Sequence, residues 1–162
     1  MKKMVSLIVV FGIIFVSCTT MPKSVEIEPF EEVVTVSDIT ADVLFVKVNS
    51  WMVDSFKNAD SVIQFSDKEA GIVKGKYITP NVQDGMWLYD IESTITVEVR
   101  EGRYRISMDN PIVYYKGTTY APTAGNRQIY PLTDNLAEKL KVEWANLAKS
   151  LNGSLSTPSS DW

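Results

Sequence analysis

Residues 87–115 read WLYDIESTITVEVREGRYRISMDNPIVYY, and this stretch decides the fold class. Apolar and polar residues alternate along it, as they do in strands with one packed face and one solvated face. The apolar positions are Trp87, Tyr89, Ile91, Ile95, Val97, Val99, Tyr104, Ile106 and Met108, and the polar positions are Asp90, Glu92, Thr94, Thr96, Glu98, Arg100, Arg103, Arg105 and Ser107. The Glu101-Gly102 pair predicts a turn in the middle. We therefore predict a long antiparallel hairpin, Trp87–Arg100 and Arg103 to about Tyr115.

Two segments outside the hairpin have the apolar spacing of amphipathic helices. The first follows a short strand at Glu32–Val36 and has Ser37 as its predicted N-cap. The second helix is predicted to begin after Thr133, its N-cap, and to end at Asn152-Gly153. The apolar positions are Ala41, Leu44, Phe45, Val48, Trp51, Met52 and Phe56 in the first helix, and Leu136, Leu140, Trp144, Leu147 and Leu151 in the second.

Further strands are predicted between the first helix and the hairpin. They are Ser61–Phe65 and Gly71–Thr79, joined by a polar turn at residues 66–71, and a loop at residues 80–85 follows. Gly117–Tyr130 is expected to be a loop. Together these elements predict a two-layer α+β fold, in which two helices pack on one face of an antiparallel sheet, in the order β-α-β-β-β-β-α.

The N-terminus has the features of a bacterial lipoprotein signal. Lys2 and Lys3 precede the apolar run Val5–Val16, which is too short to span a bilayer. Residues 15–18, Phe-Val-Ser-Cys, resemble a lipobox, and Cys18 is the only cysteine in the chain. We expect cleavage after residue 17 and attachment of fatty acyl chains such as palmitate to Cys18. The alternative is a signal peptide without lipid.

This interpretation divides the chain into four parts. They are a signal peptide at 1–17, a lipidated tether at 18–30, a domain at 31–153 and a disordered tail at 154–162. The lipid would place the protein in the cell envelope, and Thr19, where an Asp would favour the inner membrane, favours the outer membrane. Because the acyl chains alone can hold the protein at the membrane, the domain needs no membrane-binding face.

One segment resembles a known family. Ser50–Phe56 and Ser61–Lys76 contain a helix-borne Trp, a Phe five residues later, Val-Ile-Gln-Phe, Asp-Lys-Glu-Ala-Gly, Ile and Lys-Gly. This pattern resembles the DUF4468 family, bacterial envelope proteins that contain a domain of unknown function with a TBP-like fold, over about Val33–Tyr115. The resemblance implies that fold and an envelope location, and it implies no activity.

Composition argues against several classes of function. The formal net charge is −4, and it becomes −6 when removal of residues 1–17 takes away two lysines, so we expect no nucleic-acid partner. The chain has no histidine, which rules out Ser-His-Asp and Cys-His devices. With Cys18 committed to lipid, the usual zinc ligands are missing too. We expect no cofactor, no metal and no enzymatic activity.

The candidate binding residues are aromatic. Tyr114, Tyr115 and Tyr120, near the loop after the hairpin, are candidates for the rim of a peptide or glycan groove, and packing under the loop is the alternative. Trp51, Trp87 and Trp144 are expected to fill the core between helices and sheet. Two functions remain open: a membrane-anchored binding or adaptor module for a protein, peptide or glycan, or a structural or assembly component of an envelope complex.

Overall fold

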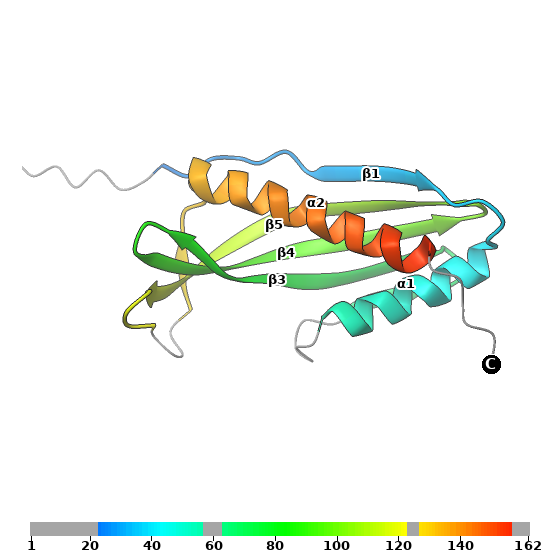
Figure 1. Ribbon diagram of the computed structural model, residues 1–162, viewed down its shortest axis with the longest axis horizontal. Helices are drawn as coiled ribbons and strands as arrows, with labels where there is room; N and C mark the ends of the chain where they lie inside the picture. Colours follow the sequence, from blue (N-terminus) through cyan, green and yellow to red (C-terminus); the bar gives the residue numbers. More distant parts are fainter. Residues whose placement is uncertain (1–22, 57–62, 123–126, 157–162) are drawn as a thin grey trace, which may run out of the picture.

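A computed structural model describes residues 23–56, 63–122 and 127–156. Within these residues, one six-stranded antiparallel sheet and two helices form two layers (Figure 1). The elements are β1 Phe30–Thr35, α1 Ala41–Ser55, β2 Phe65–Asp67, β3 Ile72–Asp84, β4 Trp87–Arg100, β5 Arg103–Thr118, β6 Gln128–Tyr130 and α2 Asp134–Ser156. The strand order is β1-β5-β4-β3-β2, and β6 also pairs with β5. The predicted fold class is confirmed, with β6 as an added strand.

The central hairpin agrees with its prediction. β4 has the predicted bounds, and Gly102 turns with a φ of +68°, which glycine adopts without strain. β3 and β5 extend beyond their predicted ends, into segments that were predicted to be loops. Residues 80–84 of the predicted loop at 80–85 are the end of β3, where a bulge between Thr79 and Val82 accommodates Pro80. The predicted loop Gly117–Tyr130 contains both the end of β5 and the whole of β6.

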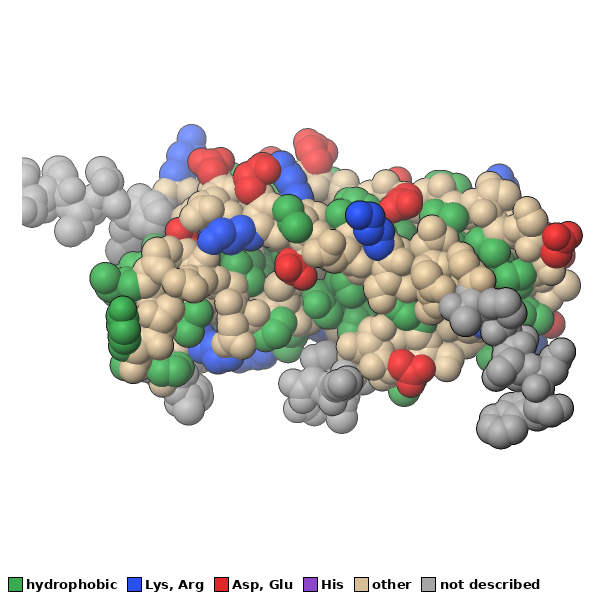
Figure 2. All heavy atoms as spheres, viewed as in Figure 1, with side chains coloured by type: hydrophobic (Ala, Val, Ile, Leu, Met, Phe, Trp, Pro, Cys, Tyr) green, Lys and Arg blue, Asp and Glu red, His purple; other side chains and the backbone are tan. Residues whose placement is uncertain are grey.

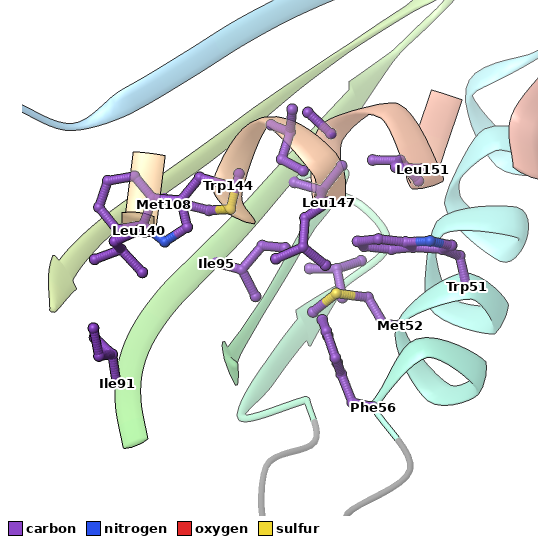
Figure 3. Packing of buried hydrophobic residues seen from close by; sticks show 14 of the residues in the cluster. Trp51, Met52, Phe56, Ile91, Ile95, Met108, Leu140, Trp144, Leu147 and Leu151 are labelled. Carbon is purple, nitrogen blue, oxygen red and sulfur yellow. The ribbon is translucent and has the colours of Figure 1, made fainter. Parts of the chain in front are cut away.

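Both helices pack on the same face of the sheet (Figure 3). In α2, Trp144 Nε1 donates a hydrogen bond of 3.2 Å to Ser93 Oγ, and both residues are buried. In α1, Met52 lies against Gly75, which pairs with Ile95. Ser93 and Ile95 are two positions apart on β4 and therefore point to the same side. The core lies between this side and the two helices.

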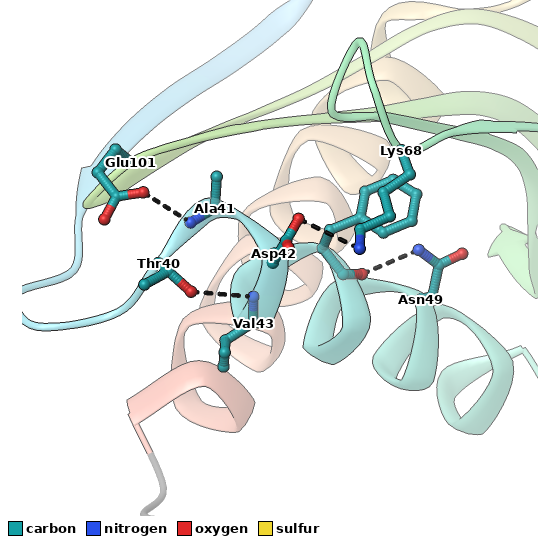
Figure 4. Close-up of polar contacts among 8 residues, drawn as sticks. Thr40, Ala41, Asp42, Val43, Asn49, Lys68 and Glu101 are labelled. Atoms are coloured by element: carbon teal, nitrogen blue, oxygen red, sulfur yellow. Dashed lines mark hydrogen bonds and ion pairs between the residues drawn. The ribbon is translucent and has the colours of Figure 1, made fainter.

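The start of α1 is fixed by the hairpin turn (Figure 4). Thr40, not the predicted Ser37, is the N-cap, and its Oγ1 accepts from Val43 N at 3.4 Å. Glu101 Oε2 accepts from Ala41 N at 3.0 Å. Helix α1 therefore begins where two oxygens satisfy its first free N–H groups, and a carboxylate also suits the positive end of a helix.

The end of α2 differs from the prediction. The helix continues through Asn152-Gly153 to Ser156, because Leu151 and Leu155 are both fully buried against the core. Glycine inside a helix costs about 1 kcal/mol relative to alanine, which is less than burying one leucine contributes. Residues 154–156 of the predicted tail are therefore helical, and residues 157–162 lie outside the described part.

Part of the predicted tether is packed on the domain. Val25 N donates to Leu132 O at 2.8 Å, and Val25 and Ile27 pack against the core cluster. The packed chain thus begins before residue 31. The predicted signal peptide, Cys18 and residues 19–22 lie outside the described residues. Within the described ranges, neither helix is long and apolar enough to cross a bilayer.

Candidate functional site

The sheet face opposite the helices is the candidate functional surface, and we call it the open face. Neither described helix lies over it. Its members come from every strand and are mostly charged or polar. They include Glu31, Val33, Phe65, Lys74, Lys76, Glu92, Thr94, Thr96, Glu98, Arg100, Arg103, Arg105, Tyr114 and Ile129.

Glu92 is the centre of an ionic cluster on the open face. Lys76 Nζ donates to Glu92 Oε1 at 2.5 Å, and Arg127 Nη1 lies 3.9 Å from Glu92 Oε2. The hydrogen bond to Glu92, and then the charge of Glu92, raises the pKa of Lys76. Glu92 lies on the predicted face of the sheet, but the prediction that it is exposed to solvent was wrong, because it is only 8% exposed. Cationic side chains from β3 and from the segment before β6 cover it.

The three candidate tyrosines do not form one rim. Tyr114 lies on the open face, where Arg127 Cζ is 4.6 Å from the centre of its ring. Tyr115 points to the other side and contacts the ring of Tyr89. Tyr120 is 91% exposed in the turn after β5. Consecutive strand residues point to opposite faces, so Tyr114 and Tyr115 cannot line one groove.

Of the three tryptophans predicted to lie in the core, two are buried and one is partly exposed. Trp51 and Trp144 are buried between the layers, as expected. Trp87 is 43% exposed, and its ring packs edge-on against Tyr115 with 5.8 Å between centroids. Trp87 is the first residue of β4, at the end of the sheet, where a side chain has neighbours on fewer sides. Its assignment to the core was therefore wrong.

A hollow of about 220 Å³ lies at the other end of the open face, beside the hairpin turn. We call it the arginine hollow. Its lining residues are Val33, Glu98, Arg100, Arg103, Tyr104 and Arg105.

The arginines of this hollow differ in their partners. Arg105 Nη2 donates to both carboxylate oxygens of Glu98 at 2.8 Å, and this hydrogen bond raises the pKa of Arg105. Arg100 and Arg103 lie directly opposite each other across the hairpin. Like charges in that position repel and cost stability.

The carboxylates nearest to Arg100 and Arg103 already have other partners. Glu98 is paired with Arg105, and Glu101 is turned toward the N-terminus of α1. Among the described carboxylates, none lies within 4.0 Å of a nitrogen of Arg100 or Arg103. Two guanidinium groups therefore face solvent beside an apolar Val33, an arrangement suited to a carboxylate or phosphate that accepts paired hydrogen bonds.

The sequence contained one signal for this site. Arg100 and Arg103 flank a two-residue turn, and such residues must face each other. The Glu92 cluster had no such signal, because Lys76 and Arg127 reach Glu92 only through the strand pairing. Within the described ranges, no group of three or more carboxylate, cysteine or histidine side chains is placed to hold a metal ion.

Comparison with known proteins identifies the family. The model of the family described as a domain of unknown function (DUF4468) with TBP-like fold matches residues 30–114, more than half of the chain. The chain belongs to the DUF4468 family. This match confirms the resemblance drawn from Trp51, Phe56 and the segment that follows them.

Solved structures agree on the fold of this DUF4468 protein. A DUF4468 family protein from Bacteroides ovatus has a TM-score of 0.61 at 16% identity, covering 86% of this chain and 94% of that chain. A TBP-like protein from Parabacteroides distasonis has a TM-score of 0.58 at 11% identity, covering 76% of this chain and 92% of that chain. No curated relative matches the chain. At these identities the likeness concerns the fold alone.

Proposed function

We propose that this DUF4468 protein is a lipid-anchored protein of the bacterial cell envelope, and that it binds an acidic group of a protein, peptide or glycan in the arginine hollow. The observation that carries the binding proposal is the pair Arg100 and Arg103, whose side-chain nitrogens have no described carboxylate within 4.0 Å although the chain as a whole is acidic. On this proposal the protein is not an enzyme and needs no cofactor.

The anchor rests on Cys18. It is the only cysteine and directly follows a basic stretch, a short apolar run and a small residue. Thr19 after it favours the outer membrane. Metabolic labelling with a fatty acid tests this directly: the label should appear on the wild-type protein and be absent from Cys18→Ala. Label retained in Cys18→Ala would refute the anchor.

The binding proposal follows from electrostatics. Two like charges held opposite each other repel, and an anion between them removes that repulsion while accepting hydrogen bonds from both guanidinium groups. Glu101 cannot take this place, since its carboxylate serves α1. Val33, which is exposed on β1 opposite Arg105, adds an apolar contact next to the charged groups.

The test is an NMR titration of the protein in detergent with inorganic phosphate and, separately, with N-acetylglutamate. We expect amide shifts in residues 98–105, and loss of at least ten-fold in affinity in Arg100→Ala/Arg103→Ala. Lys141→Ala/Lys149→Ala, on α2, is the charge-matched control and should bind like wild type. Equal binding by the Arg100/Arg103 variant, or no shift near the hollow with either anion, would show that this is not an anion site.

The second candidate, a structural or assembly component, is favoured by a different surface. Val43, Val46 and Val53 are exposed and lie at helical spacing on the outer side of α1. Crosslinking in the native envelope would decide between them. If Val46→Asp abolishes a crosslinked partner that Arg100→Ala/Arg103→Ala retains, then assembly through α1 is the better description.

A further inference from the structure

The end of the domain farthest from the arginine hollow carries a group of exposed apolar side chains. Met86 is 56% exposed, Trp87 is 43% exposed and Tyr120 is 91% exposed. They come from two turns that lie side by side: Thr119 N donates to Met86 O at 2.9 Å, and Trp87 pairs with Thr118. We call these three residues the aromatic end.

The N-terminal segment lies at the same end. Val25 is hydrogen-bonded to Leu132, just before α2, and Asn135 in the first turn of α2 is hydrogen-bonded to Asp84, two residues before Met86. In Figure 1 the N-terminal chain and the β3–β4 turn are on the left, whereas the β4–β5 turn is on the right. Figure 2 shows hydrophobic side chains gathered on that same left edge.

A groove borders the N-terminal segment. It has a volume of about 880 Å³ and lies between residues 24–29, residues 109–113 of β5 and residues 129–132. Ile112 and Ile129 on its walls are exposed. Two exposed apolar side chains therefore also lie beside the segment that leads toward Cys18.

The packing of Val25 shortens the tether. Val25 is the first described residue with a backbone hydrogen bond to the rest of the domain, so six residues, 19–24, separate Cys18 from this attachment to the domain. The seven Cα–Cα steps from Cys18 to Val25 span at most about 25 Å when fully extended. A lipid on Cys18 would thus hold this end of the domain within reach of the bilayer surface.

We propose that the aromatic end is a membrane-contact surface that enters the interfacial layer of the bilayer in which the lipid of Cys18 is anchored. This inference rests on the anchor in the proposed function. Trp and Tyr prefer the membrane–water interface because each combines an apolar ring with a polar group. Met86 adds an apolar side chain at the tip. Once the lipid is inserted, the tether keeps this end at a high effective concentration near the bilayer, so a few side chains are enough to hold it in contact with the surface.

The test uses the lipidated protein in vesicles of phosphatidylethanolamine and phosphatidylcholine. Acylation of Cys18 leaves an introduced cysteine as the only free thiol for an environment-sensitive fluorophore. We compare Tyr120→Cys with Asn152→Cys, an exposed position near the end of α2. Spin-labelled lipids should quench the label at position 120 at least three-fold more than the label at position 152.

The outcomes separate the two proposals. If fatty-acid labelling shows no lipid on Cys18, the anchor fails, and this inference fails with it. If lipid is present but position 120 is quenched no more than position 152, the anchor stands and the membrane-contact surface is wrong.

A second variant tests the apolar contact itself. Met86→Ser, added to Tyr120→Cys, should reduce quenching at position 120 at least two-fold while the circular dichroism spectrum stays unchanged, because Met86 is exposed. Unchanged quenching in this variant would mean that the end is held near the bilayer by the tether alone.

Discussion

Tyr104 illustrates how a single residue departs from the pattern around it. It is 1% exposed, and its hydroxyl has no hydrogen-bond partner within the described ranges. Burial raises the pKa of Tyr104 to about 12. Tyr89 is buried as well, but its hydroxyl is hydrogen-bonded to Tyr130. The two tyrosines thus form a natural comparison between an unsatisfied and a satisfied buried hydroxyl.

Tyr104→Phe should raise the free energy of unfolding by about 1 kcal/mol, because a buried hydroxyl without a partner costs about 1–3 kcal/mol. Tyr89→Phe should lower it by about 1 kcal/mol, since it removes a hydrogen bond. Urea denaturation at pH 7 measures both. A destabilised Tyr104→Phe would mean that its hydroxyl has a partner in solution.

The same residue predicts a pH dependence. The folded state raises the pKa of Tyr104 from 10.0 to about 12, so the unfolded chain loses its phenolic proton first. Ionisation of Tyr104 does not affect the free energy of unfolding below pH 10, but it lowers that free energy as pH rises from 10 to about 12. The difference in unfolding free energy between wild type and Tyr104→Phe should therefore widen over this interval, and a constant difference would contradict the shifted pKa.

At the scale of elements, α2 shows packing prevailing over local signals. Gly153 lies inside the helix, and among the described residues a Cβ added there would meet no atom within 4 Å beyond its chain neighbours and the backbone of its own helix. Gly71, before β3, is the opposite case. Its φ is +68°, and a Cβ would come within 2.5 Å of Val99 O. One glycine is replaceable, whereas the other is required by its backbone conformation and by its neighbour.

Gly153→Ala should therefore raise the free energy of unfolding by about 0.5–1 kcal/mol, through better helix propensity and a less flexible unfolded chain. Gly71→Ala should lower it by more than 1 kcal/mol, because it combines strain with a clash. Thermal denaturation of the two variants beside wild type measures the contrast. Destabilisation by Gly153→Ala would indicate that α2 ends before residue 153 in solution.

At the scale of the whole molecule, the two proposed surfaces lie at opposite ends of the sheet. β4 runs from Trp87 at the aromatic end to Arg100 at the arginine hollow. Fourteen strand residues span about 45 Å. An anchor on Cys18 would then leave the hollow facing away from the membrane, free for a partner in the envelope.

This arrangement predicts a difference in accessibility. In lipidated protein on vesicles, Val33→Cys at the hollow should react with a bulky water-soluble maleimide as fast as it does in detergent. Tyr120→Cys should react several-fold more slowly on vesicles than in detergent. Equal protection of both positions would mean that the domain lies flat on the bilayer instead of standing on its aromatic end.

Local pattern was sufficient for part of this protein. Alternation along β4 and β5, the Glu101-Gly102 turn and the helical stripe that contains Trp144 each depend on neighbours in the chain, and all three predictions are confirmed. The family also followed from one contiguous segment. These features are set by strand and helix periodicity and by turn chemistry, which a single segment contains.

Tertiary structure decided what covers each residue. Glu92 is buried because Lys76 and Arg127 reach it across the sheet, and Trp87 is exposed because the sheet ends there. Periodicity states which side of an element a residue faces, but burial depends on segments far away in the chain. For the same reason the sequence by itself predicted a lipid at Cys18, whereas only the tertiary structure shows that Val25, seven residues later, is hydrogen-bonded to Leu132 beside α2.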